Sequence, residues 1–323
     1  MSNMTEDQAK WFSGTFDKLV KNIEGAVLGK DRAVRLSLTA LLAEGHLLLE
    51  DVPGTGKTSL AKAIANTVDG TSSRIQFTPD LLPSDVTGVT IYDQRTGKFE
   101  FYKGPIFATI VLADEINRAS PKTQSALLEV MEEGNVTVDG VRHPTGSPFM
   151  VIATQNNIEQ IGTYRLPEAQ LDRFLIKTSL GYPDHDSTIK ILSDSSNRDR
   201  AAGVKALITA KAVKDMATLA STTHIETSVL AYINRIAEET RRSVDLRLGV
   251  SVRGCLSLVR CLKVWAASQG RAFVTPDDVK DLMLPVFSHR VVLDPEAEFT
   301  GATAESVLAK IRDEIKPPAL KVG

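Results

Sequence analysis

The chain has 323 residues, of which 42% are hydrophobic and 24% charged, and its formal net charge at neutral pH is -2. This composition is typical of a globular protein with two domains and excludes a disordered or fibrous chain, and the balance of charge gives no basic footprint for non-specific nucleic-acid binding. No run approaches the roughly 20 apolar residues of a membrane-spanning helix, and the opening MSNMTEDQAK has no signal-peptide pattern, so we expect no membrane insertion and a cytoplasmic location.

The first half of the chain alternates short apolar runs with helical patterns. Such alternation predicts an α/β fold in which a parallel sheet is covered by helices on both faces. Ser120-Pro121 predicts a helix start, with serine as N-cap and proline at the first helical position, and this helix is expected to run to about Glu133. The expected strands are His46–Glu50, Arg74–Phe77, Ile106–Ala113, Phe149–Thr154 and Phe174–Ser179.

Two insertions interrupt this alternation. Residues 86–103 contain two β-like arms around Thr96-Gly97, and residues 134–144 read as a hairpin that turns at Asp139-Gly140. The sequence leaves open whether each is a functional loop or an exposed hairpin without a role.

Beyond Tyr182-Pro183 the strand patterns end and helical patterns take over. We therefore predict a nucleotide-binding α/β domain at 1–182 and an all-α lid domain at 183–323. Thr275 followed by Pro276 predicts a capped helix start in the second domain. The helices are expected near 186–195, 210–220, 226–242, 252–268, 276–286 and 303–315.

The segment HLLLEDVPGTGKTSLAKAIA is a strand, a glycine-rich turn and an amphipathic helix, which is the context of a phosphate-binding P-loop. Gly54 and Gly56 let the backbone N–H groups converge on phosphate oxygens, and the helix dipole adds positive potential. Lys57 is expected to reach the β- and γ-phosphates, and the Thr58 hydroxyl to bind Mg²⁺. The segment expected to bind nucleotide comprises Pro53, Gly54, Thr55, Gly56, Lys57, Thr58 and Ser59.

One position departs from the P-loop pattern, which asks for glycine where this chain has Asp51. A carboxylate that faced the phosphates would repel them. We therefore expect Asp51 to turn away from the phosphate site.

A second element, the apolar run Ile106–Ala113, ends in Asp114-Glu115. The carboxyl ends of parallel strands are where α/β sheets bind ligands. Asp114 is expected to hold Mg²⁺ through water, and Glu115 to orient and polarise the attacking water. A kinase or a simple GTPase does not need this second carboxylate, so the pair indicates ATP hydrolysis.

Three further residues complete the predicted site. Asn156 ends the strand PFMVIATQN and is expected to help orient the water, although a strand-end asparagine is also common in turns. Arg173 precedes the last expected strand, where it is expected to reach the nucleotide of a neighbouring subunit. Arg253 opens a lid helix and is expected to approach the γ-phosphate. For either arginine, a structural ion pair is the alternative.

These segments resemble the MoxR branch of the AAA+ ATPases. The resemblance covers about residues 25–305 and is carried by LLLEDVPGTGKT, VLADEINRASPKTQSALLEVMEE, FMVIATQN, IEQIGTYRLPEAQLDRF, GVSVRG and HRVVLDPEAEFTGATAE. The run from DEINRA through LPEAQLDRF is far more specific than the P-loop alone.

The resemblance implies a role for each matching position. Lys57 and Thr58 resemble Walker A, Asp114 and Glu115 Walker B, and Asn156 sensor 1. Arg173 looks like the arginine finger and Arg253 like sensor 2. The stretch that contains Val27 and Gly29 resembles the segment lining the adenine pocket. The two insertions look like the helix-2 insert and the pre-sensor-1 hairpin, which face the pore of a ring.

The family resemblance also implies partners and cofactors. It implies ATP with Mg²⁺, a homo-oligomeric hexameric ring, and chaperone-like action on a protein client, often one that bears a von Willebrand factor A domain. Departures from the family pattern are Asn157, Arg165 and Val252, each in place of a common proline. Arg165 puts a second cation near the expected subunit interface and leaves open whether it shares the finger role.

Two other functions stay possible on sequence grounds. One is an ATP-dependent scaffold with little turnover, against which Glu115 and Arg173 argue because binding alone needs neither. The other is a remodeller of nucleic acid, for which Arg142 and His143 of the second hairpin give only a thin basic signal beside Asp139. The two cysteines, Cys255 and Cys261, are expected to be core thiols of a reducing compartment. No histidine pair has metal-ligand spacing.

Overall fold

The computed structural model describes residues 3–156, 163–194 and 199–319. By their internal contacts these residues form two compact units, which interleave along the chain: unit 1 comprises Met1–Lys18, Pro167–Lys177 and Asp215–Gly323, and unit 2 comprises Leu19–Leu166 and Thr178–Lys214. Because the chain passes between the units several times, no single cut separates them. The domain boundary near residue 183 stays a prediction.

The central sheet has five strands in the order β2-β5-β8-β1-β9, and β2 pairs in parallel with β5, β5 with β8, and β8 with β1. Neighbours that are not consecutive in sequence require crossover connections, as in other helix-covered parallel sheets. The five strands expected from the apolar runs are thus confirmed, with bounds that are shorter for β1, β5 and β9 and shifted for β2 and β8: β1 (Leu47–Glu50), β2 (Ser72–Gln76), β5 (Ile110–Asp114), β8 (Met150–Gln155) and β9 (Ile176–Thr178).

Burial on both faces explains why the middle strands read as continuous apolar runs. Every residue of β5 is buried, as are the first five residues of β8. The polar residues of these strands stand at their carboxyl ends, so functional groups gather at one edge of the sheet.

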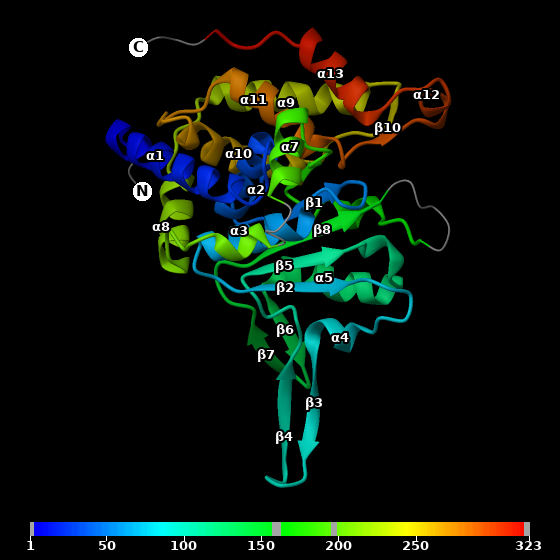
Figure 1. Ribbon diagram of the computed structural model, residues 1–323. Helices are drawn as coiled ribbons and strands as arrows, with labels where there is room; N and C mark the ends of the chain where they lie inside the picture. Colours follow the sequence, from blue (N-terminus) through cyan, green and yellow to red (C-terminus); the bar gives the residue numbers. More distant parts are fainter. Residues whose placement is uncertain (1–2, 157–162, 195–198, 320–323) are drawn as a thin grey trace. The chain divides into compact units, whose positions relative to one another are not determined.

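Helices of unit 2 cover the sheet, and α3 packs against β2 and β5 (Figure 1). The predicted start of α5 is confirmed, because Ser120 caps the backbone N–H of Thr123 and Pro121 is the first helical residue. The helical segments of this unit are α2 (Asp31–Leu42), α3 (Lys57–Thr67), α4 (Pro83–Thr87), the 3-10 turn η1 (Ile116–Arg118), α5 (Pro121–Glu133), α7 (His185–Ser193) and the 3-10 turn η2 (Arg200–Gly203).

Both expected insertions are antiparallel hairpins, and β3–β4 extends away from the central sheet (Figure 1). The two hairpins meet where Phe101 stacks on His143, with ring centroids 4.1 Å apart. Their strands are β3 (Gly88–Asp93), β4 (Lys98–Lys103), β6 (Asn135–Val138) and β7 (Val141–Pro144).

Unit 1 is mainly helical, as the sequence predicts for the second half. The predicted cap at Thr275 is confirmed as a capping box with Asp278. One feature departs from the helical expectation: β10 (Leu246–Leu248) and β11 (Val292–Leu293) form a two-stranded sheet too short for a recognisable alternation. The helices are α6 (Glu168–Leu171), α9 (Thr227–Arg242), α10 (Val252–Ser268), α11 (Pro276–Phe287), α12 (Pro295–Phe299) and α13 (Ala304–Glu314).

Two helices have residues in both units: α1 (Glu6–Glu24) and α8 (Ala210–Ser221). Of these two, α8 matches the helix expected near residues 210–220, whereas no helix was expected over α1. Within the described ranges, every helix falls short of the length and apolar character needed to cross a membrane.

Candidate functional site

The P-loop joins β1 to α3 and has the backbone that its glycines predict. Gly54 and Gly56 have φ of +83° and +96°, which residues with a side chain adopt only with strain. Gly56 is also the N-cap of α3 and supplies no side-chain cap, so the first turn of the helix keeps N–H groups for an anion. This segment therefore has the form of a phosphate cradle.

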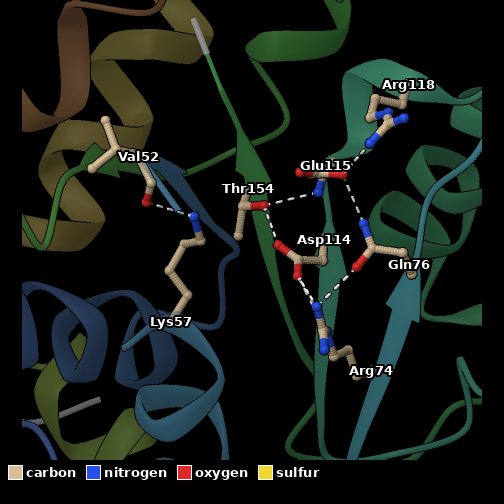
Figure 2. Close-up of polar contacts among 8 residues, drawn as sticks. All are labelled: Val52, Lys57, Arg74, Gln76, Asp114, Glu115, Arg118 and Thr154. Carbon is tan, nitrogen blue, oxygen red and sulfur yellow. Dashed lines mark hydrogen bonds and ion pairs between the residues drawn. The ribbon is translucent and has the colours of Figure 1, made fainter. Parts of the chain in front are cut away.

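Lys57 begins α3, and its ammonium group donates a hydrogen bond to the carbonyl oxygen of Val52 at 3.1 Å (Figure 2). The bond joins the two ends of the loop across the glycines. A phosphate in the cradle offers a stronger, charged acceptor to the same ammonium group.

The carboxylate of Asp51, the residue that departs from the P-loop pattern, has partners of its own. It accepts hydrogen bonds from the backbone N–H groups of Leu180 and Gly181, the latter at 3.1 Å. These residues follow β9, so the aspartate joins the start of the P-loop to the chain beyond the sheet edge. Two amide donors offset its negative charge.

Asp114 and Glu115 stand at the carboxyl end of β5, beside Thr154 of β8. The Thr154 hydroxyl donates to Asp114 Oδ1 at 2.7 Å and accepts from the backbone N–H of Glu115 at 2.9 Å (Figure 2). Glu115 has φ of +58°, a left-handed conformation that a non-glycine residue adopts at some cost. One threonine thus fixes both carboxylate residues relative to the neighbouring strand.

Three residues without a role in the sequence analysis hold the two carboxylates (Figure 2). Arg74 of β2 donates to Asp114 Oδ2 at 2.6 Å, and Gln76, two residues on, donates to Glu115 Oε2 at 2.8 Å. Arg118 pairs with the same Glu115 oxygen at 2.9 Å. The sequence shows polar residues at alternate positions of β2, which could have marked Arg74 and Gln76 as candidates. Only the strand order shows that β2 lies beside β5, where these residues reach the carboxylates.

These groups line one pocket of about 270 Å³ in unit 2. The structure therefore brings the expected P-loop residues together with Asp114, Glu115 and Asn156, and it adds four residues from β2 and β8. The lining residues of both kinds are Asp51, Pro53, Gly54, Thr55, Gly56, Lys57, Thr58, Ser59, Arg74, Gln76, Asp114, Glu115, Thr154, Gln155 and Asn156.

The residues expected at the adenine pocket also lie in unit 2. A methyl group built on Gly56 would stand 3.6 Å from Cγ1 of Val27, so Val27 lies beside the P-loop. Gly29 has φ of +71°, and a methyl group there would meet Ser187 Oγ at 2.6 Å. Gly29 thus packs tightly against the start of α7, where no larger residue fits.

The two predicted arginines belong to unit 1, whereas the pocket residues belong to unit 2. Arg173 follows α6, and Arg253 lies in the first turn of α10 with Nε 3.7 Å from Asp172 Oδ2. Asp172 also accepts from Nε of Arg290 at 2.7 Å. Arg165 is exposed and belongs to unit 2, so it and Arg173 stand on different units. Asn157 lies outside the described residues.

Arg290 holds the segment that carries Arg173. Its guanidinium group, with a side chain 2% exposed, also donates to the carbonyl oxygens of Phe174 at 2.7 Å and Leu175 at 3.2 Å. Burial lowers the pKa of Arg290, which the neighbouring Asp172 carboxylate opposes. No local pattern predicts this contact, because it joins residues 118 positions apart in the chain.

A P-loop at the carboxyl end of β1, paired acids at the carboxyl end of β5 with β8 between the two strands, and a helical C-terminal part define an AAA+ nucleotide-binding protein. Comparison with known proteins agrees. Residues 46–176 match the model of the ATPase family associated with various cellular activities (AAA), and residues 238–311 match the AAA lid domain.

Relatives match over nearly the whole chain. Protein YeaC of Bacillus subtilis (strain 168) is 47% identical over 93% of this chain and 94% of its own length. The chaperone MoxR1 of Mycobacterium tuberculosis is 37% identical over 94% of this chain and 82% of its own length. The crystal structure of a predicted ATPase from Cytophaga hutchinsonii aligns with a TM-score of 0.90 and 35% identity over 97% of this chain and 98% of that chain. The chain belongs to the MoxR family of AAA+ ATPases.

Proposed function

We propose that this protein hydrolyses ATP to ADP and phosphate in a ring of identical subunits and uses the energy to remodel protein clients. The single observation that carries the proposal is the pocket in which Lys57 and Thr58 of the P-loop face Asp114 and Glu115. A site that only bound phosphate would need the first pair and not the second.

The donor set fits Mg²⁺. This ion prefers hard oxygen ligands and takes few of them from the protein, keeping several waters and substrate phosphates. Asp114 and Thr58 offer one carboxylate and one hydroxyl in the same pocket, and no cluster of three or more acidic, histidine or cysteine residues suited to a metal occurs within the described ranges. Held by Asp114 and Thr58, a bound Mg²⁺ would neutralise the negative charge that develops on the phosphate groups during hydrolysis.

In the proposed mechanism, Lys57 and the backbone N–H groups of the P-loop hold the β- and γ-phosphates. Glu115 accepts a hydrogen bond from the attacking water and polarises it, and Asn156 helps to orient that water. Thr154 supports this arrangement because it holds both the Asp114 carboxylate and the Glu115 backbone. Gln76 and Arg118 both donate to Oε2 of Glu115, so the other carboxylate oxygen can accept from the water.

We assign Arg173 to the nucleotide of the neighbouring subunit and Arg253 to the γ-phosphate of its own. An arginine that enters at the transition state contributes about 10³- to 10⁵-fold in rate. Asp172 precedes Arg173 in sequence, and its carboxylate lies 3.7 Å from Nε of Arg253. This contact supports the proposal that a movement of one arginine is transmitted to the other. The adenine ring is assigned to the segment of Val27 and Gly29.

The nature of the client is proposed from the relatives. A family member of 37% identity is named a chaperone, which supports protein remodelling over nucleic-acid work. The exposed β3–β4 hairpin, where the Phe99 side chain is 75% exposed, offers apolar surface for such a client. A hexameric ring and a client with a von Willebrand factor A domain complete the proposal.

The test compares phosphate release by the wild type with that by Glu115→Gln, together with binding of a fluorescent ATP analogue. The proposal expects the variant to bind the analogue as the wild type does and to lose turnover by at least about 100-fold. Wild-type turnover that survives in Glu115→Gln would remove the catalytic role of Glu115. Binding without turnover in the wild type would favour a scaffold that uses ATP for assembly.

A further inference from the structure

Both carboxylate oxygens of Asp114 are engaged within the chain. Oδ1 accepts from the Thr154 hydroxyl at 2.7 Å, and Oδ2 accepts from Nη2 and Nε of Arg74 at 2.6 and 3.2 Å. The Asp114 side chain is only 11% exposed. A carboxylate this buried requires partners for its charge, and a single arginine supplies the only cation among the contacts described for it.

Arg74 is suited to leave this partner. Its side chain is 53% exposed and lines the nucleotide pocket, so the guanidinium group can move without opening the core. The Nε and Nη2 groups of Arg74 both donate to Oδ2 of Asp114, whereas the strongest arginine–carboxylate pairs use two parallel bonds to two oxygens. Arg74 and Asp114 therefore form a close ion pair without the two parallel bonds of the strongest pairs, and the arginine side chain is half-exposed.

The same guanidinium group reaches the second carboxylate through one side chain. Nη2 of Arg74 donates to Gln76 Oε1 at 2.8 Å, and Gln76 Nε2 donates to Glu115 Oε2 at 2.8 Å (Figure 2). Arg74 and Gln76 are two apart on β2, where alternate residues share a face. A continuous chain of contacts thus joins Asp114 to Glu115 through Arg74 and Gln76.

We propose that Arg74 is the resident counter-ion of Asp114, which sets the affinity of the nucleotide site for its divalent cation. Oδ2 of Asp114 becomes available to a metal-bound water only after Arg74 has left it. The departure also removes the bond that anchors Gln76, so the contact between Gln76 and Glu115 loosens in the same step. This inference rests on the proposed function, because it takes Asp114 as a ligand of the nucleotide-bound cation.

Charge gives the direction of the effect. A guanidinium group at Asp114 repels a second cation and competes with it for the same oxygen. Replacing Arg74 by an uncharged residue should therefore increase the affinity of the site for a metal ion. While the pair persists, the site therefore holds its cation more weakly than its oxygen ligands alone would.

The test measures the metal directly, using Mn²⁺ in place of Mg²⁺ because oxygen-ligand sites accept both. The full chain, saturated with ADP, is titrated with Mn²⁺ while electron paramagnetic resonance records the free ion, and a titration without protein accounts for Mn²⁺·ADP in solution. We expect Arg74→Gln to bind Mn²⁺ about fivefold more tightly than the wild type, the change that corresponds to an ion pair of about 1 kcal/mol. Arg74→Lys, which keeps the charge, should fall between the two.

Arg118→Gln is the matched control, because it removes the same charge from Glu115 in place of Asp114. Its Mn²⁺ affinity should remain at the wild-type value. Equal or weaker Mn²⁺ binding by Arg74→Gln, with ADP binding intact, would overturn the inference and leave the proposed function standing. If equilibrium dialysis finds no ADP bound to the wild type, the proposed function fails and the inference fails with it.

Discussion

The buried arginine of unit 1 allows a stability prediction of large size. Arg290→Met removes the close partner of Asp172 and four contacts to main-chain carbonyl oxygens, those of Asp172, Phe174, Leu175 and Val286. Breaking a buried ion pair costs about 3–5 kcal/mol. Since methionine keeps part of the apolar stem, we expect a loss of about 4 kcal/mol, a large fraction of the total for a typical domain.

The assay is urea unfolding followed by tryptophan fluorescence. Both tryptophans of the chain, Trp11 and Trp265, belong to unit 1, so the signal reports on the unit that contains the substitution. With a slope of about 2 kcal/mol per molar urea, the midpoint should fall by about 2 M. Lys280→Met is the matched control in the same unit, because it removes a lysine whose side chain is 38% exposed and 3.7 Å from Asp277.

The control should change the free energy of unfolding by less than about 1 kcal/mol, since exposed ion pairs contribute little. An Arg290→Met variant that unfolds at the same urea concentration as Lys280→Met would refute the reasoning. It would mean that the guanidinium group contributes no more from its buried position than a surface ammonium group does.

Three further predictions concern single residues. Burial, followed by the charge of the next residue, lowers the pKa of His289 well below its ordinary value, so below pH 6.5 the unfolded chain binds a proton that the folded chain does not. The free energy of unfolding of unit 1 should therefore fall with decreasing pH, by about 1.4 kcal/mol per pH unit more in the wild type than in His289→Gln, in fluorescence-detected unfolding between pH 6 and 5. Burial also raises the pKa of Cys261 to about 12, so Ellman's reagent at neutral pH should leave this thiol unmodified until urea unfolds the protein, and rapid labelling of the native thiol would contradict its burial. Gly29→Ala should lower the thermal midpoint by several degrees in circular dichroism, because a methyl group meets Ser187 at 2.6 Å in a left-handed backbone, whereas Gly203→Ala, with open space around it, should have little effect.

The sequence predicts the parts of the fold that depend on local patterns. Continuous apolar runs predicted the five strands of the sheet, and Ser120-Pro121 and Thr275-Pro276 predicted two helix starts that the structure confirms. The helix α1 was not named in advance, although Phe12, Phe16 and Ile23 recur at helical spacing and are fully buried. Its signal was present in the sequence.

Other features depend on tertiary neighbours, and local patterns do not contain them. Arg74 meets Asp114 only because β2 lies beside β5, forty residues further on, and Arg290 meets Asp172 across a still longer separation. The sheet of β10 and β11 has strands of three and two residues, too short for alternation to be read. In the site, the sequence thus predicts the residues that belong to a recognisable motif. It does not predict those whose role depends on contacts between distant segments.

The measurement that tests the central claim most directly is steady-state ATP hydrolysis as a function of protein concentration, for the wild type and for Arg173→Ala. A site shared between subunits predicts specific activity that rises with concentration as subunits assemble, and a loss of about 10³-fold or more in the variant. Specific activity that is independent of concentration and unchanged by Arg173→Ala would contradict the shared site, because catalysis would then be complete within one subunit.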